Sequence, residues 1–112
     1  MSARLSSDVL VSALLQMAAR ESGFGTVIAK GDANAGAVLI VLAERGRPVQ
    51  VLERLLQPDG RYAWGSPLKG GHNEDELNKF LARRRGFDRD SWILELDVPS
   101  AERFAAEITA LD

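Results

Sequence analysis

The sequence predicts an α+β domain in which a mainly antiparallel sheet of four to five strands has helices packed on one face. Strand-length apolar segments follow one another with only short turns between them, and short connections join antiparallel neighbours. Segments with apolar residues at helical spacing precede, interrupt and follow the strands, so the expected order is α-β-β-β-β-α-β-α. The 112 residues are 46% hydrophobic and 27% charged, a balance typical of globular proteins with one core. We therefore expect a single domain over residues 1–112.

The first expected element is a helix from about Ser7 to Glu21. Ser6 or Ser7 can cap its amino end, and Gly23 is suited to its termination. Its apolar face is formed by Leu10, Val11, Leu14, Met17 and Ala18. We expect this face to pack on the sheet.

Four segments of strand-forming composition come next, at residues 24–31, 36–44, 49–56 and 61–65. The second has an unbroken apolar centre, which predicts burial on both faces of the sheet. Turn-forming residues make up the connections, namely GDANAG at residues 31–36, ERGRP at residues 44–48 and PDG at residues 58–60. We expect GDANAG to be a hairpin or a bulged connection between neighbouring strands.

After a loop at residues 66–72, a second helix is expected from about Glu74 to Arg85. Asn73 is a natural N-cap, and three acidic residues in the first turn complement the helix dipole. The buried face consists of Leu77, Phe80 and Leu81. Gly86 is expected to take the left-handed cap conformation, with Phe87 as the hydrophobic contact that follows it.

A last strand and a last helix complete the expected order. Residues 92–98 alternate, with Glu95 and Asp97 on one face and an apolar set, Trp92, Leu94, Leu96 and Val98, on the other. The carboxylates could be paired for acid–base chemistry, but a solvated face explains them more simply. A helix then opens at Pro99-Ser100 and directs Phe104, Ile108 and Leu111 inward.

Composition excludes several classes of protein. Cysteine is absent, which rules out disulfide scaffolds, thiolate metal sites and cysteine nucleophiles. The amino-terminal segment lacks the uninterrupted apolar run of a signal peptide, and no stretch approaches the roughly 20 apolar residues that span a bilayer. We expect a cytoplasmic protein without a membrane partner.

No motif obliges a particular chemistry. His72 is the single histidine, and it lies just before a helix start, where a general base could be presented, although a lone loop histidine is usually only solvated. GDANAG has glycines at phosphate-loop spacing, but Ala37 and Val38 replace the required lysine and hydroxyl. Asp32 and Asn34 in this loop remain candidate binding residues. We expect no catalytic residue, metal or cofactor.

Arginines form the most distinctive surface. The chain holds eleven arginines among its 14 basic residues, and four of them, Arg83, Arg84, Arg85 and Arg89, lie within seven positions. They are candidate binding residues for an anion or nucleic acid, with aromatic side chains as stacking area. The alternative is that they complement the helix dipole and pair with neighbouring acids. The formal net charge of −2 favours the alternative.

Several segments together resemble a bacterial family known as domain of unknown function 1491, found in alphaproteobacteria. The matching segments are Val11-Ser12-Ala13-Leu14-Leu15, Gly31-Asp32-x-x-Ala35-Gly36-Ala37-Val38-Leu39, Asp59-Gly60, Phe80-Leu81-x-Arg83-Arg84-Arg85 and Phe87-Asp88-x-Asp90-x-Trp92-Ile93-Leu94-Glu95. They span nearly the whole chain in order. The resemblance implies no activity, cofactor or catalytic residue. Two departures, Gly86 after the arginines and a segment after Trp64 that is short of charge, weaken the argument for an extended basic site.

Three functional hypotheses follow. The leading one is a non-enzymatic interaction or accessory domain, as a homodimer or with another protein, through sheet edges or apolar faces. The second is an anion or nucleic-acid binding module at the arginines. The third is a small enzyme that uses His72.

Overall fold

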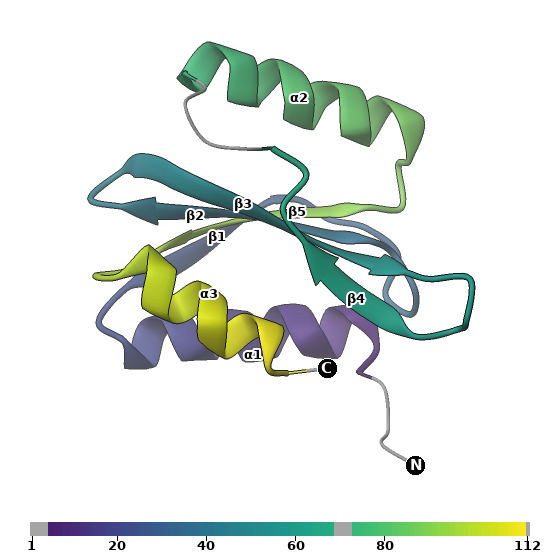
Figure 1. Ribbon diagram of the computed structural model, residues 1–112, viewed down its shortest axis with the longest axis horizontal. Coiled ribbons are helices and arrows are strands. Elements are labelled where there is room, and N and C mark those ends of the chain that lie inside the picture. The colour runs from purple at the N-terminus through teal and green to yellow at the C-terminus, as the bar shows by residue number, and fades with distance from the viewer. Residues whose placement is uncertain (1–4, 69–72, 112) are drawn as a thin grey trace.

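The computed structural model describes residues 5–68 and 73–111 and has three helices and five strands in the expected order (Figure 1). The elements are α1 (Ser7–Arg20), β1 (Phe24–Ala29), β2 (Val38–Glu44), β3 (Arg47–Leu56), β4 (Tyr62–Gly65), α2 (Glu74–Phe87), β5 (Trp92–Asp97) and α3 (Ala101–Thr109). The α+β fold class is confirmed. None of the helices within the described ranges is long and apolar enough to cross a membrane.

The sheet is mixed, because the last strand in sequence lies inside it. The strand order is β1-β5-β2-β3-β4, with β2 and β5 parallel and every other neighbouring pair antiparallel. The predicted meander is therefore present in β2–β3–β4, while β5 separates β1 from β2. GDANAG is accordingly not a hairpin turn. Six of the seven residues of β2 are buried, as expected for a central strand with neighbours at both edges.

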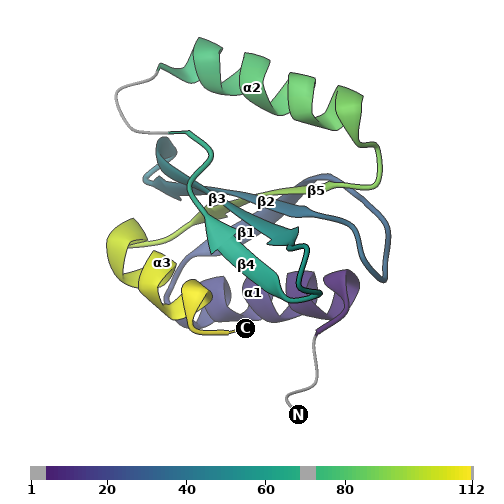
Figure 2. The same ribbon diagram turned by 45° about the vertical axis from the view of Figure 1, so that its right-hand side comes forward.

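Helices cover both faces of the sheet. Helices α1 and α3 lie side by side on one face, as the sequence predicts, and α2 lies across the other (Figures 1 and 2). The core is divided accordingly: Ile40 and Leu94 face α1 and α3, whereas Leu39 and Ile93 face α2. Two of the three helices thus share one face, as expected, and α2 is the exception (Figure 1). Its buried residues are only Leu77 and Leu81, so α2 covers a smaller core.

Both ends of α2 test the predicted caps. The Asn73 side chain accepts a hydrogen bond from the Glu76 N–H at 2.8 Å, which confirms the N-cap. The predicted C-cap is wrong: the helix continues through Gly86 and ends at Phe87, whose side chain is 85% exposed. The backbone leaves the helix at Asp88 instead, whose N–H still donates to the Arg84 carbonyl.

The remaining side-chain predictions hold in most positions. All four apolar residues on the predicted face of β5 belong to the larger core, as do Phe104 and Ile108 of α3. Leu111 was expected to face inward, but it follows the end of α3 and is 37% exposed. The Ser100 hydroxyl caps α3 by accepting from the Arg103 N–H.

Candidate functional site

The candidate residues Asp32 and Asn34 lie in the loop that leaves β1, and the loop is held by its own polar groups. One carboxylate oxygen of Asp32 accepts hydrogen bonds from the backbone N–H groups of Asn34, at 3.1 Å, and Ala35, at 2.9 Å. This arrangement is an Asx turn, in which a side chain replaces a backbone acceptor. The Asp32 carboxylate therefore shapes the loop first.

The same loop contacts the segment that leads into β5. The Asp32 N–H donates to the Asp90 carbonyl at 2.8 Å, and the Trp92 indole N–H donates to the Asp32 carbonyl at 2.7 Å. A Cβ at Gly31 or Gly36 would overlap the Asp90 carbonyl oxygen. Both glycines are thus required by the close approach of two backbones, and the spacing that imitates a phosphate loop has this steric cause.

The loop also caps α1. Its carbonyls at Asn34 and Ala33 accept from the N–H groups of Ser7, at 3.1 Å, and Asp8, at 2.9 Å. The fully buried hydroxyl of Ser7 donates to the Gly36 carbonyl at 2.6 Å. Backbone carbonyls of the loop therefore satisfy two of the free N–H groups of this helix end, and the N-cap Ser6 makes no side-chain capping bond.

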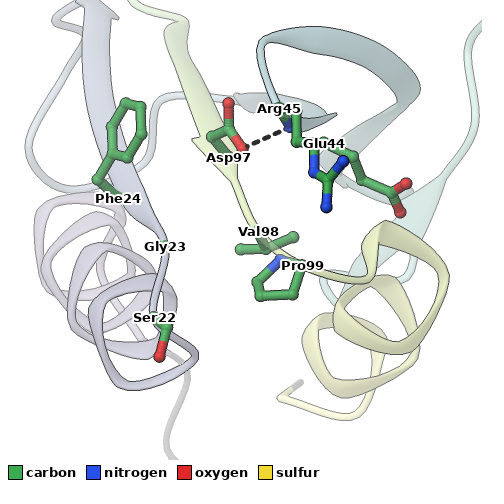
Figure 3. Close-up of a pocket in the computed structure, with 8 residues that line it drawn as sticks. All are labelled: Ser22, Gly23, Phe24, Glu44, Arg45, Asp97, Val98 and Pro99. Carbon is green, nitrogen blue, oxygen red and sulfur yellow. Dashed lines mark hydrogen bonds between the residues drawn. The ribbon is translucent and has the colours of Figure 1, made fainter.

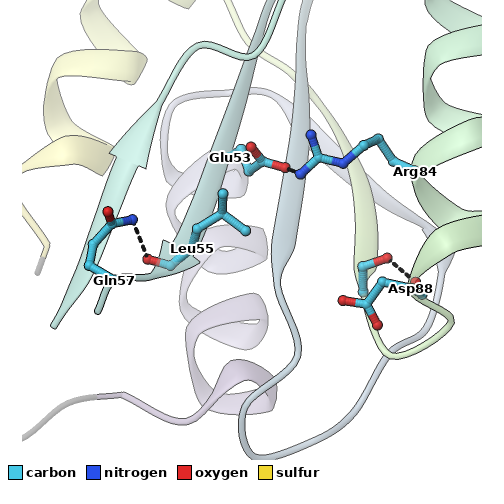
Figure 4. A network of polar contacts seen from close by, with 6 residues as sticks. Glu53, Leu55, Gln57, Arg84 and Asp88 are labelled. Carbon is cyan, nitrogen blue, oxygen red and sulfur yellow. Dashed lines mark hydrogen bonds and ion pairs between the residues drawn. The ribbon is translucent and has the colours of Figure 1, made fainter. Parts of the chain in front are cut away.

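The four candidate arginines do not converge. Arg84 forms an ion pair with Glu53, which projects from β3 and is 6% exposed (Figure 4). Arg85 donates to the Ser91 carbonyl just before β5. Arg84 and Arg85 thus join α2 to the sheet and to the strand that follows it. Arg83 and Arg89 are exposed.

Two charged residues at the centre of β3 were missed by the sequence analysis. Glu53 faces α2, and Arg54 faces the opposite side, where it is fully buried. The Arg54 guanidinium lies 3.8 Å from the centre of the Tyr62 ring and donates to the Leu5 carbonyl at 2.9 Å. The signal was present as two adjacent charges inside an otherwise apolar strand segment, where an uncompensated charge is costly.

Strand β1 forms an exposed edge of the sheet. Its six residues, FGTVIA, include neither a charged residue nor a proline. Phe24 is 64% exposed, Val27 40% and Ile28 54%. A register shift between Val27 and Ala29 leaves Ile28 in a bulge. The opposite edge, β4, has only four residues.

A cavity of about 620 Å³ opens at one end of the sheet, where β1 begins and β2 and β5 end (Figure 3). It is lined by Ser22, Gly23, Phe24, Glu44, Arg45, Asp97, Val98 and Pro99. Asp97, one of the two carboxylates considered for acid–base chemistry, lies in this lining, whereas none of the candidate binding residues does. Within residues 5–68 and 73–111, no group of three or more acidic or histidine side chains is placed to hold a metal ion. His72 lies outside the described residues, so its proposed role stays a hypothesis.

Comparison with known proteins identifies relatives over almost the whole chain. Residues 5–106 match the family model described as Protein of unknown function (DUF1491). A crystal structure of a DUF1491 family protein from Caulobacter crescentus has 31% identity and a TM-score of 0.75, over 90% of this chain and 94% of that one. An NMR structure of a DUF1491 family protein from the same organism gives 31% identity and a TM-score of 0.79, over 92% and 94%. A solution structure of a protein from A. tumefaciens has 26% sequence identity and a TM-score of 0.73, over 88% of this chain and 89% of that one. No curated protein matches the chain.

Proposed function

The chain belongs to the DUF1491 family, as the resemblance of its motifs implied, and from this premise we propose that it is a non-enzymatic interaction domain that pairs β1 with β1 of a second copy. The proposal includes the cytoplasmic location expected from the sequence. Support for it comes from the use of the polar side chains and from the character of the sheet edge.

The exposed edge of β1 is the observation that carries the proposal. Edge strands present unpaired N–H and C=O groups, and proteins that avoid pairing protect them with charges or prolines. The residues of β1 offer neither, and three of its apolar side chains are at least 40% exposed. The bulge at Ile28 is the one protective feature, and it leaves the segment from Phe24 to Val27 in regular register.

An antiparallel pairing of two β1 strands suits the charges that flank the strand. Lys30 follows the carboxyl end of β1, and Glu21 precedes its amino end. A two-fold axis through the strand would place the two Lys30 side chains at opposite ends of the ribbon, whereas a parallel pairing would place them together. The two sheets would then form one continuous sheet, with main-chain hydrogen bonds supplying affinity.

The polar groups with the greatest burial serve the fold. Glu53 pairs with Arg84, and Arg54 donates to the Leu5 carbonyl. This use of charge favours a scaffold that presents a surface over a catalytic centre.

Sedimentation velocity over micromolar to millimolar concentrations tests the proposal. We expect a monomer–dimer equilibrium that Ile28→Lys shifts strongly toward monomer, because a second strand paired with this edge would desolvate the lysine. Val49→Lys is the matched control: Val49 is 47% exposed on β3, which two strands separate from β1. A wild-type chain that stays monomeric at millimolar concentration contradicts the proposal, as does a dimer that Ile28→Lys leaves intact.

A second candidate function, binding of an anion or single-stranded nucleic acid, is favoured by one observation. Phe87 is 85% exposed, and Arg83, one helical turn before it, and Arg89 are also exposed. Fluorescence anisotropy with a labelled oligonucleotide should show salt-dependent binding that Arg83→Ala with Arg89→Ala removes. Arg20→Ala, at the end of α1 on the other side of the sheet, is the control. Binding that survives the double replacement excludes this candidate.

A further inference from the structure

The cavity at the end of the sheet lies where the topology favours a ligand. Strands β2 and β5 run parallel, so their carboxyl ends, at Glu44 and Asp97, meet at the same edge. Crevices beyond the carboxyl ends of parallel strands are common ligand sites. The volume of about 620 Å³ is within the range of small-molecule sites.

Three locally unfavourable residues meet around this one cavity. Among the described residues, only two besides glycine have a positive φ, Ser22 at 65° and Arg45 at 52°, and both line the cavity. The left-handed conformation is costly for side chains other than Asn and Asp, and a tight hairpin turn at Arg45 would be served better by Asn or Gly. The third residue is Phe24, a large aromatic that is 64% exposed. Violations of local preference that gather in one place indicate a functional site.

The carboxylates of the cavity are already occupied by the backbone. The two oxygens of Asp97 accept from the N–H groups of Arg45, at 3.0 Å, and Gly46, at 2.7 Å. Glu44 accepts from the Ala101 N–H at 2.7 Å, at the start of α3. These two residues therefore hold the hairpin turn and the helix end.

The guanidinium of Arg45, unlike the carboxylates of Asp97 and Glu44, is not used to hold the backbone. Within the described part of the chain, no hydrogen bond or ion pair joins it to another residue. Figure 3 shows the Arg45 side chain directed toward Val98 and Pro99, with Phe24 on the other side of Asp97. Five N–H donors in a planar fork thus face a wall that is partly apolar.

We propose that this cavity binds a small organic monocarboxylate, with the carboxylate paired to Arg45 and an apolar body against Pro99 and Phe24. A guanidinium accepts a carboxylate through two parallel hydrogen bonds. Asp97 and Glu44 add two negative charges to the lining, which disfavours a doubly charged phosphate relative to a singly charged carboxylate. This inference does not depend on the pairing of β1, because the cavity is complete in one chain.

Titration of the ¹⁵N-labelled protein with phenylacetate and hexanoate, followed by amide NMR shifts, tests the proposal. Saturable shifts are expected at residues 22–24, 44–46 and 97–99. Inorganic phosphate should produce much weaker binding. A short peptide with an aromatic carboxyl-terminal residue, compared with its amide, distinguishes a chain terminus from a free acid as the source of the carboxylate.

Arg45→Asn isolates the guanidinium, because Asn tolerates the left-handed turn. Its affinity for the carboxylate should fall by roughly tenfold or more, since the charge-assisted pair is lost, while its thermal midpoint is retained or raised. Arg47→Asn, two residues away on β3, removes the same charge and should bind as the wild type does. The proposal is overturned if none of the carboxylates shifts these amides at millimolar concentration, or if Arg45→Asn binds as tightly as Arg47→Asn. The monomeric Ile28→Lys variant should bind normally, which separates this test from that of the dimer.

Discussion

Replacing Arg84 by Met removes the cation that faces the buried carboxylate of Glu53. Glu53 is 6% exposed on β3, and the Arg84 side chain, at 33% exposure, shields it from the α2 side (Figure 4). Met keeps an unbranched apolar stem and a high helix propensity, so the change tests the charge more than the packing. Few apolar contacts hold α2, whose buried residues are only Leu77 and Leu81.

The expected loss of stability is large for a single residue. Removing one partner of a buried ion pair costs about 3–5 kcal/mol, because the other charge is left uncompensated. Water that reaches the partly exposed Arg84 position can hydrate the carboxylate, so we expect about 2–3 kcal/mol here. That is a substantial part of the roughly 5–15 kcal/mol by which a domain is stable.

Urea unfolding, followed by fluorescence of the two tryptophans, measures the effect. A double-mutant cycle with Glu53→Gln should give a coupling energy of about 1–2 kcal/mol, because the neutral amide no longer needs the cation. Arg83→Met, on the same helix but exposed, is the control and should change stability by about 0.5 kcal/mol or less. If Arg84→Met costs no more than Arg83→Met, the ion pair does not hold α2 on the sheet.

Other substitutions test the loop and the helix end by the same unfolding measurement. Gly36→Ala should lower the free energy of unfolding by about 2 kcal/mol or more, since the added Cβ overlaps the Asp90 carbonyl oxygen. Gly86→Ala, whose Cβ meets nothing within 4 Å, should instead stabilise α2 by about 0.5 kcal/mol. Equal effects of the two substitutions would contradict the steric argument. Ser7→Ala should cost about 1–2 kcal/mol, because the buried Gly36 carbonyl loses its donor, and an unchanged urea midpoint would show that this bond contributes nothing. Phe87→Ser should change the free energy of unfolding by no more than about 0.5 kcal/mol, because Phe87 is exposed. A larger loss would show that Phe87 makes the capping contact that the sequence predicts.

The element types could be predicted because each depends on residues close in sequence. The alternation of residues 92–98 identified the face of β5 that enters the larger core. It did not reveal that Ile93, on the other face, would also be buried. That burial follows from the central position of β5, which is set by pairing with strands far away in the chain.

The roles of the arginines could not be predicted for the same reason. Four closely spaced arginines predict a cationic surface. For the three that lie in α2, the face that the helix turns to the sheet decides which side chains reach a partner and which stay exposed. The partner of Arg84 is Glu53, which lies two elements earlier in the chain. The cavity was missed because the positive φ angles of Ser22 and Arg45 are not visible in the sequence, and only the structure shows them.

The GDANAG loop shows what the sequence could predict and what it could not. Ala37 and Val38 argue against a phosphate site, because they supply neither charge nor hydroxyl. The reason for the two glycines is the Asp90 carbonyl, which reaches the loop only when β5 is inserted beside β1.

The insertion of β5 between β1 and β2 has a consequence for synthesis at the ribosome. When β1 to β4 have emerged, β2 can pair with β3, but the places beside β1 and at the other edge of β2 stay empty until β5 follows α2. Until then the nascent chain exposes apolar strands without their partner, and such exposed edges promote aggregation. The sheet can therefore be completed only after β5 has left the ribosome, which favours slow, non-local closure and engagement of the unfinished chain by chaperones.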